Sequence, residues 1–175
     1  LALLGTGRVA PNPLVGCVIV QGDRIIGEGY HQQFGGPHAE VNAILSCTES
    51  VEGATAFVTL EPCSHFGKTP PCADLLIQSG IKEVFIANLD PNPLVAGKGV
   101  SALEAAGITC HIGLLASAGE WINRHFFTFH RLKRPYITFK WASSGDGFIA
   151  SNGGEPLQLS NELSAIRVHQ MRAEH

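Results

Sequence analysis

The sequence lacks an apolar run of about eighteen residues, which a membrane-spanning helix would need, and lacks a basic stretch followed by a cleavable apolar segment. Charge is also sparse, because 15% of the 175 residues are charged and the net charge is −3. No dense stripe of lysine and arginine is present. Since nucleic-acid binding depends on neutralising phosphates, this argues against a nucleic-acid partner. We therefore expect a cytoplasmic protein that binds neither membranes nor nucleic acid.

Cysteine is scarce and odd in number, with five residues in the whole chain. Cys17, Cys47 and Cys110 lie in the apolar contexts VGCVIV, ILSC and ITCHIG, which are typical of buried free thiols. A disulfide framework is therefore not expected. Cys63 and Cys72 enclose the loop CSHFGKTPPC and are available for metal binding.

The hydrophobic content of 45% is ordinary for a globular protein, and the length suffices for one full core and part of another. The chain begins at Leu1 without a methionine and ends at His175 within VHQMRAEH, a helix-like pattern. We therefore expect one domain and a remainder, with flanking sequence at both ends.

Three potential zinc ligands, His38, Cys63 and Cys72, lie at two predicted helix starts. One imidazole and two thiolates suit tetrahedral zinc and leave the fourth position free for water, as catalytic sites do. Glu40 follows His38 by two residues and is not needed as a ligand. It is therefore predicted to be the group that moves protons.

Zinc-dependent nucleobase deaminases have the signature H-x-E…P-C-x-x-C, in which the glutamate is a general acid and base. His38-Ala39-Glu40 and Pro62-Cys63 fit this signature, but eight residues separate Cys63 from Cys72 instead of two. The longer loop resembles the deaminase half of the bifunctional riboflavin-biosynthesis deaminase/reductase family. The four motifs of that family, PNPxVG, HAE, TLEPCxHxGxTPPC and DPNPxVxGxG, occur in order at residues 11–16, 38–40, 59–72 and 90–99.

Two alternatives remain open for these residues. A closed structural zinc site would need a fourth protein ligand, for which His65 is the nearest candidate, but it gives no reason for Glu40. Metal-free packing of the same side chains is the other alternative.

The predicted elements alternate in a way typical of parallel crossovers, after an initial hairpin around Gly22-Asp23. They are strand 17–20, strand 24–29, helix 38–47, strand 54–60, helix 73–78, strand 83–88, helix 100–106, strand 108–112 and helix 115–129. We predict an α/β fold with a mixed sheet, a three-layer sandwich of the cytidine-deaminase type. Cys63 and Asp90 then fall in loops at the carboxyl ends of strands, where such sheets bind ligands.

The resemblance implies a substrate and the residues that hold it. The family deaminates a diamino-pyrimidinone that carries a ribosylamino 5′-phosphate, the second step of riboflavin synthesis. Zinc would activate water, and Glu40 would take its proton and protonate the departing amine. The residues that match the family's substrate contacts are Asn12, His31 and His65 near the ring, Lys68 in the ligand loop, and Asp90 and Asn92 near the ribosyl phosphate.

Each of these substrate contacts also has a structural interpretation. Lys68 in Gly-Lys-Thr suits an anionic substrate, but a solvated loop lysine is the alternative. Asn12, Asp90 and Asn92 occur in proline-rich loops, where such residues commonly cap turns. His31 and His65 are alternatively plain loop histidines. The aromatic residues of helix 115–129, Trp121, Phe126, Phe127 and Phe129, are predicted to lie in a core or an interface.

The segment Lys133-Arg134-Pro135 is predicted to be a linker, so we place a deaminase domain at residues 1–132 and a fragment of a second domain at 133–175. After the linker, PYITFKWASSGDGFIAS alternates like a strand and resembles the opening of the family's reductase domain, a dihydrofolate-reductase-like fold that uses NADPH. The resemblance implies cofactor contacts at Lys140 and Asp146. The family usually has leucine where Gly145 stands, and about forty residues cannot complete such a domain.

Three functions follow from these patterns. The first is zinc-dependent deamination in riboflavin synthesis, with NADPH-dependent reduction by the second domain of the intact protein. A cytidine or tRNA-adenosine deaminase is disfavoured by the long cysteine loop and the acidic charge balance. A non-catalytic zinc scaffold is the third, and it would tolerate a change at Glu40. We further expect a phosphorylated small-molecule substrate and a homo-oligomer.

Overall fold

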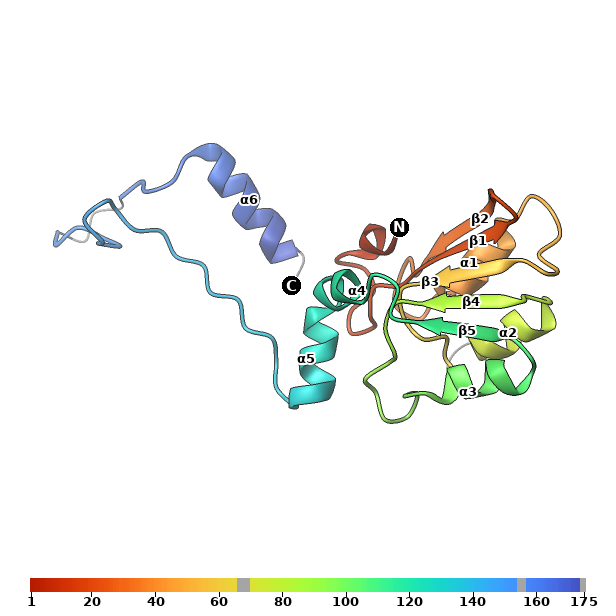
Figure 1. Ribbon diagram of the computed structural model, residues 1–175. Coiled ribbons are helices and arrows are strands. Elements are labelled where there is room, and N and C mark those ends of the chain that lie inside the picture. The colour runs from red at the N-terminus through yellow and green to blue at the C-terminus, as the bar shows by residue number, and fades with distance from the viewer. Residues whose placement is uncertain (66–69, 154–156, 174–175) are drawn as a thin grey trace. The chain divides into compact units, whose positions relative to one another are not determined.

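The structure is a computed structural model that describes residues 1–65, 70–153 and 157–173 (Figure 1). The chain divides into two compact units, residues 1–135 and 136–175. Each unit is described by itself. No helix within the described ranges is long and apolar enough to cross a membrane.

A mixed five-stranded sheet forms the centre of the first unit, with the strand order β2-β1-β3-β4-β5. Strand β1 pairs antiparallel with both β2 and β3, whereas β3, β4 and β5 are parallel. Gly22 in the β1–β2 turn has a φ of +59°, a conformation that glycine adopts without steric cost. The strands are β1 Gly16–Gln21, β2 Arg24–Tyr30, β3 Thr55–Val58, β4 Glu83–Ile86 and β5 Thr109–Ile112.

Short helices connect and follow the strands (Figure 1). They are the 3₁₀ helix η1 Ala2–Gly5 and the α-helices α1 Ala39–Leu45, α2 Cys72–Gln78, α3 Lys98–Ala105, α4 Ala116–Ile122, α5 Arg124–Leu132 and α6 Glu162–Ala173. The mixed sheet and its helices confirm the predicted fold class. Each predicted strand and helix of residues 17–112 is present, with bounds that differ by a few residues.

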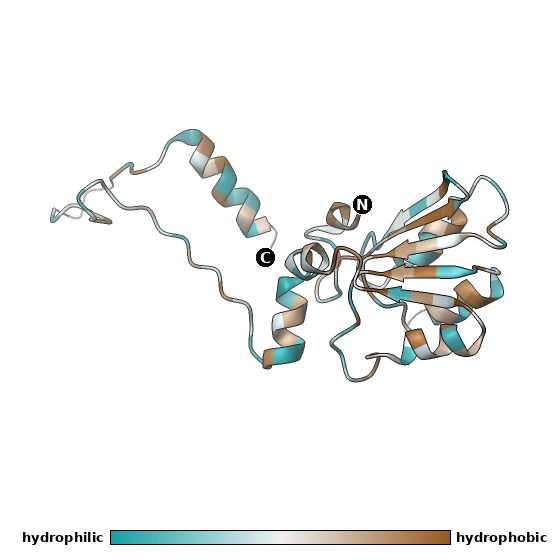
Figure 2. Ribbon diagram, viewed as in Figure 1, coloured by the Kyte–Doolittle hydropathy of each residue, from teal (hydrophilic) through white to brown (hydrophobic). Residues whose placement is uncertain are grey.

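Alternation along the strands places one set of side chains in a common core with α1, α2 and α3. Figure 2 shows the central strands largely in the hydrophobic colour. Burying a Leu or Ile side chain contributes about 1.5–3 kcal/mol, so this core supplies much of the stability of the unit. Its main members are Cys17, Ile19, Ala56, Val58, Val84 and Ile86 from the sheet and Ala39, Ala43, Ala73, Leu76, Val100 and Leu103 from the helices.

Glycines in β2 let α1 approach the sheet closely. A Cβ atom on Gly29 would lie 2.2 Å from the backbone nitrogen of Ala43, and one on Gly27 would lie 2.4 Å from Sγ of Cys47. Both distances are far below van der Waals contact, so larger residues would displace the helix. The close approach matters for function because the first turn of α1 carries His38 and Glu40.

Asn123 divides the predicted helix 115–129 into α4 and α5, so the single predicted helix was wrong. The side chain of Asn123 is 4% exposed. Its Oδ1 accepts a hydrogen bond from the backbone N–H of Leu14 at 2.7 Å, and its Nδ2 donates to the Leu14 carbonyl at 2.8 Å. This paired contact joins the PNPLVG loop to the α4–α5 corner and explains the break.

The second unit contains α6 and no strand among its described residues, so the strand-like reading of residues 136–151 was wrong. The five strands of the sheet all lie within residues 16–112, so the described residues of the second unit have no strand of their own unit to pair with. A strand without a partner leaves its backbone N–H and C=O groups unpaired and is not stable by itself. A turn at Ser144 is formed instead, in which its backbone N–H donates to the Phe148 carbonyl at 2.8 Å.

Replacing Asn123 tests the link between the PNPLVG loop and the helices. We expect Asn123→Ala to lower the free energy of unfolding by about 2 kcal/mol, because the N–H and the carbonyl of Leu14 lose their partner. Urea denaturation of the zinc-loaded protein measures the change. Asn152→Ala, at an exposed turn position, is the control. Equal denaturation midpoints for the two variants would contradict the interpretation.

Candidate active site

Three potential metal ligands converge where α1, α2 and the loop after β3 meet. His38 is the N-cap of α1, Cys63 follows β3, and Cys72 is the first residue of α2. Their ligand atoms all lie within 4.8 Å of one another. Nδ1 of His38 is 3.5 Å from Sγ of Cys63 and 3.3 Å from Sγ of Cys72. The structure thus brings together the three residues that the sequence pattern selects.

This donor set fits zinc. One imidazole nitrogen and two sulfurs are borderline-soft ligands, and a set of three leaves room for a fourth, exchangeable ligand. The cluster that the described residues form does not include His65, whose side chain is exposed. The donor chemistry therefore favours an open catalytic site over a closed structural one.

The two thiols share protons as a pair. The hydrogen bond with Cys72 is the main cause that lowers the pKa of Cys63, to about 4, and the same contact raises the pKa of Cys72. A thiol binds a metal as the thiolate, so the lowered pKa of Cys63 suits it to this role.

Glu40 lies in the first turn of α1 and is 3% exposed. Burial is the main cause that raises the pKa of its carboxyl to about 7. An isolated carboxylate is costly to bury, so its retention beside the cluster needs a reason. A carboxyl group that gains and releases a proton near neutral pH is suited to general acid–base catalysis.

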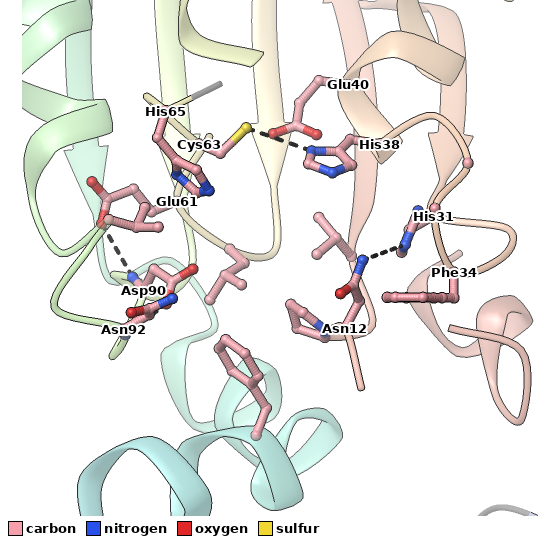
Figure 3. A pocket seen from close by; sticks show the side chains of 17 residues that line it. Asn12, His31, Phe34, His38, Glu40, Glu61, Cys63, His65, Asp90 and Asn92 are labelled. Carbon is pink, nitrogen blue, oxygen red and sulfur yellow. Dashed lines mark hydrogen bonds between the residues drawn. The ribbon is translucent and has the colours of Figure 1, made fainter. Parts of the chain in front are cut away.

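A cavity of about 330 Å³ opens next to the cluster, a size typical of small-molecule sites. Five of the predicted substrate contacts, Asn12, His31, His65, Asp90 and Asn92, line it together with His38, Glu40 and Cys63. In Figure 3, Asp90 and Asn92 lie on one side of the cavity, and Asn12, His31 and Phe34 on the other.

Three of the residues selected from the sequence do not lie in this site as described. Lys68 falls within residues 66–69, outside the described residues. Lys140 and Asp146 belong to the second unit, where both are exposed. The side chain of Asp146 accepts a hydrogen bond from Oγ of Ser144. Their predicted cofactor contacts stay predictions.

The amide of Asn12 is oriented by a chain of hydrogen bonds. Nδ1 of His31 lies 3.0 Å from the Pro37 carbonyl, which can only accept, so Nδ1 carries the proton. Nε2 of His31 is then the acceptor for Nδ2 of Asn12 at 3.1 Å. Burial lowers the pKa of His31, which favours this neutral form. The Oδ1 atom of Asn12 is thereby left to accept from a ligand in the cavity.

Asp90 and Asn92 were interpreted from the sequence either as substrate contacts or as residues that cap turns, and their positions are compatible with both roles. They line the cavity, and they also form turns, because Oδ1 of Asp90 accepts from the Asn92 N–H at 2.8 Å and Oδ1 of Asn92 accepts from the Leu94 N–H at 3.1 Å. Burial is the main cause that raises the pKa of Asp90 to about 6. Turn formation therefore fixes the direction of both side chains.

Several cavity residues were missed by sequence reasoning, namely Phe34, Leu60, Glu61, Val95 and Phe126. Phe126 was assigned to a core or an interface, but α5 places it against the cavity. Its local pattern resembles that of its neighbours on α5, so no sequence signal separates it. Glu61 directly precedes Pro62-Cys63, and this place in the metal-ligand loop could have indicated that Glu61 lies at the cavity.

Residues 2–88 match the family described as the cytidine and deoxycytidylate deaminase zinc-binding region. Together with the fold and the His/Cys/Cys cluster, this match defines a zinc-dependent deaminase domain. Among solved structures, Acinetobacter baumannii RibD, form 1, has a TM-score of 0.95 and 46% identity, covering 99% of this chain and 49% of that chain.

Curated relatives make the assignment more specific. The riboflavin biosynthesis protein RibD of Actinobacillus pleuropneumoniae is 51% identical over 175 residues, 100% of this chain and 46% of the relative. The diaminohydroxyphosphoribosylamino-pyrimidine deaminase of Buchnera aphidicola subsp. Schizaphis graminum is 53% identical over 135 residues, 77% of this chain and 92% of the relative. The chain belongs to the RibD family of riboflavin-biosynthesis deaminases, and it spans about half the length of the RibD relatives.

Metal analysis of cysteine variants tests the ligand set. We expect Cys63→Ala to lose zinc, because two ligands hold the ion far less tightly than three. Cys110→Ala, a change of the same kind on β5, should keep one zinc per chain. Plasma emission spectrometry of the purified variants measures the metal content. Equal zinc content in both variants would overturn the assignment.

The raised pKa of Asp90 makes the free energy of unfolding depend on pH. Its folded-state pKa of about 6 lies above the ordinary value of 3.8. Between these values the folded protein binds more protons than the unfolded chain, so this group lowers stability as pH rises through that window. Asp90→Asn removes the charge but keeps the acceptor for Asn92.

We expect Asp90→Asn to be more stable than the parent at pH 8 by on the order of 1–2 kcal/mol, with a difference that shrinks towards pH 4. Urea denaturation at a series of pH values measures it. Asp23→Asn, at the exposed hairpin turn, is the matched control and should show no such trend. A constant difference across the series would be inconsistent with titration of Asp90.

Proposed function

We propose that the chain catalyses the zinc-dependent hydrolytic deamination of 2,5-diamino-6-(5-phosphoribosylamino)pyrimidin-4(3H)-one in riboflavin biosynthesis. The observation that carries this proposal is the buried carboxyl of Glu40, which lines the cavity beside the three clustered ligands. A scaffold would have no use for such a group. The name of the Buchnera relative, a diaminohydroxyphosphoribosylamino-pyrimidine deaminase, supports the choice of substrate.

The residues divide the chemistry between them. His38, Cys63 and Cys72 would hold zinc, which supplies Lewis-acid activation of water at neutral pH. Glu40 accepts one proton of the attacking water and passes it to a ring nitrogen, while the oxygen bonds to the ring carbon. Glu40 then takes the second proton, from the hydroxyl now on that carbon, and delivers it to the departing amine. One C–N bond breaks, a ring carbonyl forms, and ammonia leaves. Because a single carboxyl serves several transfers, its pKa near neutrality suits both the acid and the base roles.

The cavity wall supplies groups for recognition. Oδ1 of Asn12, held outward by His31, is placed to accept from an N–H group of the pyrimidine. His65 is proposed to contact the ring, and Asp90 and Asn92 the ribosyl phosphate arm. A carboxylate repels a phosphate, so Asp90 is better matched to the ribosyl hydroxyls. Lys68 is proposed to pair with the phosphate, on sequence grounds alone.

The second unit is proposed to be the start of the reductase domain that the intact family protein carries. NADPH would reduce the ribosyl group of the deamination product there, with Lys140 and Asp146 at the cofactor. The resemblance of residues 135–151 to the reductase opening and the doubled length of the RibD relatives support this assignment.

Location and partners are also proposals. A small-molecule substrate without nucleic acid fits the net charge of −3 and the concave site. A cytoplasmic location is supported by five free cysteines, since oxidising compartments favour disulfides. A homo-oligomer is supported by large exposed apolar residues such as Trp121 and Phe129.

The central test is Glu40→Gln. Glutamine keeps the shape but cannot carry the proton, so we expect the fold and zinc content to persist while ammonia release falls by at least about 10²–10⁴-fold. The assay supplies the diamino-pyrimidinone ribosyl phosphate and follows ammonia alongside zinc. Glu28→Gln, an exposed glutamate on β2, is the control and should retain activity.

Near-normal turnover by Glu40→Gln with full zinc would remove Glu40 from the mechanism. The parent protein decides between deaminases, because cytidine turned over in preference to the diamino-pyrimidinone would move it to the cytidine class. No turnover of either substrate would favour the scaffold.

A further inference from the structure

We infer that Glu61 is a positioning residue that ties the metal-ligand loop to the loop carrying Asp90 and Asn92, and thereby sets the affinity for substrate. This inference rests on the proposed deaminase function and names a residue that acts through others. Glu61 lies two residues before Cys63, so its backbone belongs to the loop of the metal cluster.

The carboxylate of Glu61 is 4% exposed and accepts four backbone hydrogen bonds. Oε2 accepts from the N–H groups of Asp90 at 3.1 Å and Gly97 at 3.0 Å. Oε1 accepts from the N–H groups of Gly99 at 2.9 Å and Val100 at 3.3 Å. The two oxygens therefore bracket both ends of the segment 90–100, as Figure 3 shows for Asp90.

Two of these bonds satisfy the first turn of α3, which otherwise has unpaired donors. Gly97, the N-cap of α3, has no side chain that could cap the helix. The missing acceptors come from Glu61, which precedes Gly99 by 38 positions in the sequence. The fit is close, because a Cβ on Gly99 would lie 2.0 Å from the Pro62 carbonyl oxygen. The start of α3 is thus seated directly on the Glu61-Pro62 backbone.

The same carboxylate reaches the substrate side of the cavity. It fixes the backbone of Asp90, whose Oδ1 in turn orders Asn92, and both side chains line the cavity. Glu40 and His38 stand on α1, which has no hydrogen bond to Glu61. Loosening this clamp should therefore move the recognition groups and leave the proton carrier in place.

The test is Glu61→Gln in the zinc-loaded chain. Glutamine retains one acceptor oxygen and turns an NH₂ group towards backbone donors, so two of the four bonds are lost. We expect KM for the diamino-pyrimidinone ribosyl phosphate to rise at least about tenfold, equivalent to 1.4 kcal/mol, while kcat changes less than about threefold. Zinc content should not change.

A second readout does not depend on the substrate. Hydrogen–deuterium exchange of the amides at 90, 97, 99 and 100 should accelerate in Glu61→Gln, whereas the amides of α1 keep their protection. Glu104→Gln, the same change at an exposed position of α3, is the matched control and should alter neither exchange nor KM. If Glu61→Gln does not fold, Glu61→Asp keeps both oxygens, retracts them by one methylene, and should show the same KM rise.

The outcomes separate the two proposals. A parent protein without turnover refutes the proposed function, and the exchange data then decide on the clamp by themselves. Normal KM and unchanged exchange in an active Glu61 variant would overturn the inference. Loss of zinc with a parallel fall in kcat and faster exchange throughout residues 1–135 would also overturn it, by showing that Glu61 is needed for folding alone.

Discussion

The close packing of two thiols, an imidazole and a buried carboxyl in one small volume is the constraint on which the rest of this structure depends. Each of these groups is costly to bury without a partner. Cys63 and Cys72 each lie within hydrogen-bond distance of Nδ1 of His38, in an arrangement that a zinc ion suits. Glu40 is buried beside them, with a hydrogen bond to Cys72. The sheet, the helix starts and the glycines of β2 together keep this unfavourable cluster in place.

The walls of the cavity come from elements that approach the cluster from different directions. The loops after the parallel strands β3 and β4 supply Cys63, Asp90 and Asn92, as expected at the carboxyl edge of such strands. The PNPLVG loop supplies Asn12 from the opposite side, and Asn123 anchors that loop through the Leu14 backbone. The groups proposed for recognition and for proton transfer therefore lie on separate pieces of backbone.

Prediction from sequence succeeded where the signal was local. His38 and Glu40 lie together at the start of one helix, and the apolar, β-rich runs 17–20 and 54–60 coincide with strands β1 and β3. It failed where a distant contact decided the outcome. Asn123 breaks a helix because of a partner 109 positions away, and residues 135–151 alternate like a strand although no strand of the described residues pairs with them.

The sequence by itself determined the class of fold and selected the three clustered side chains and Glu40 as candidates for the site, because ligand chemistry and short-range periodicity are properties of residue types and their spacing. The tertiary structure alone decided that the oxygen and not the nitrogen of the Asn12 amide faces the cavity, that Phe126 lines it, and that Glu61 holds the segment 90–100. These features depend on which backbone donors and carbonyls meet across the fold. Hydrogen bonds act only within about 3.5 Å, so no pattern along the chain can specify them.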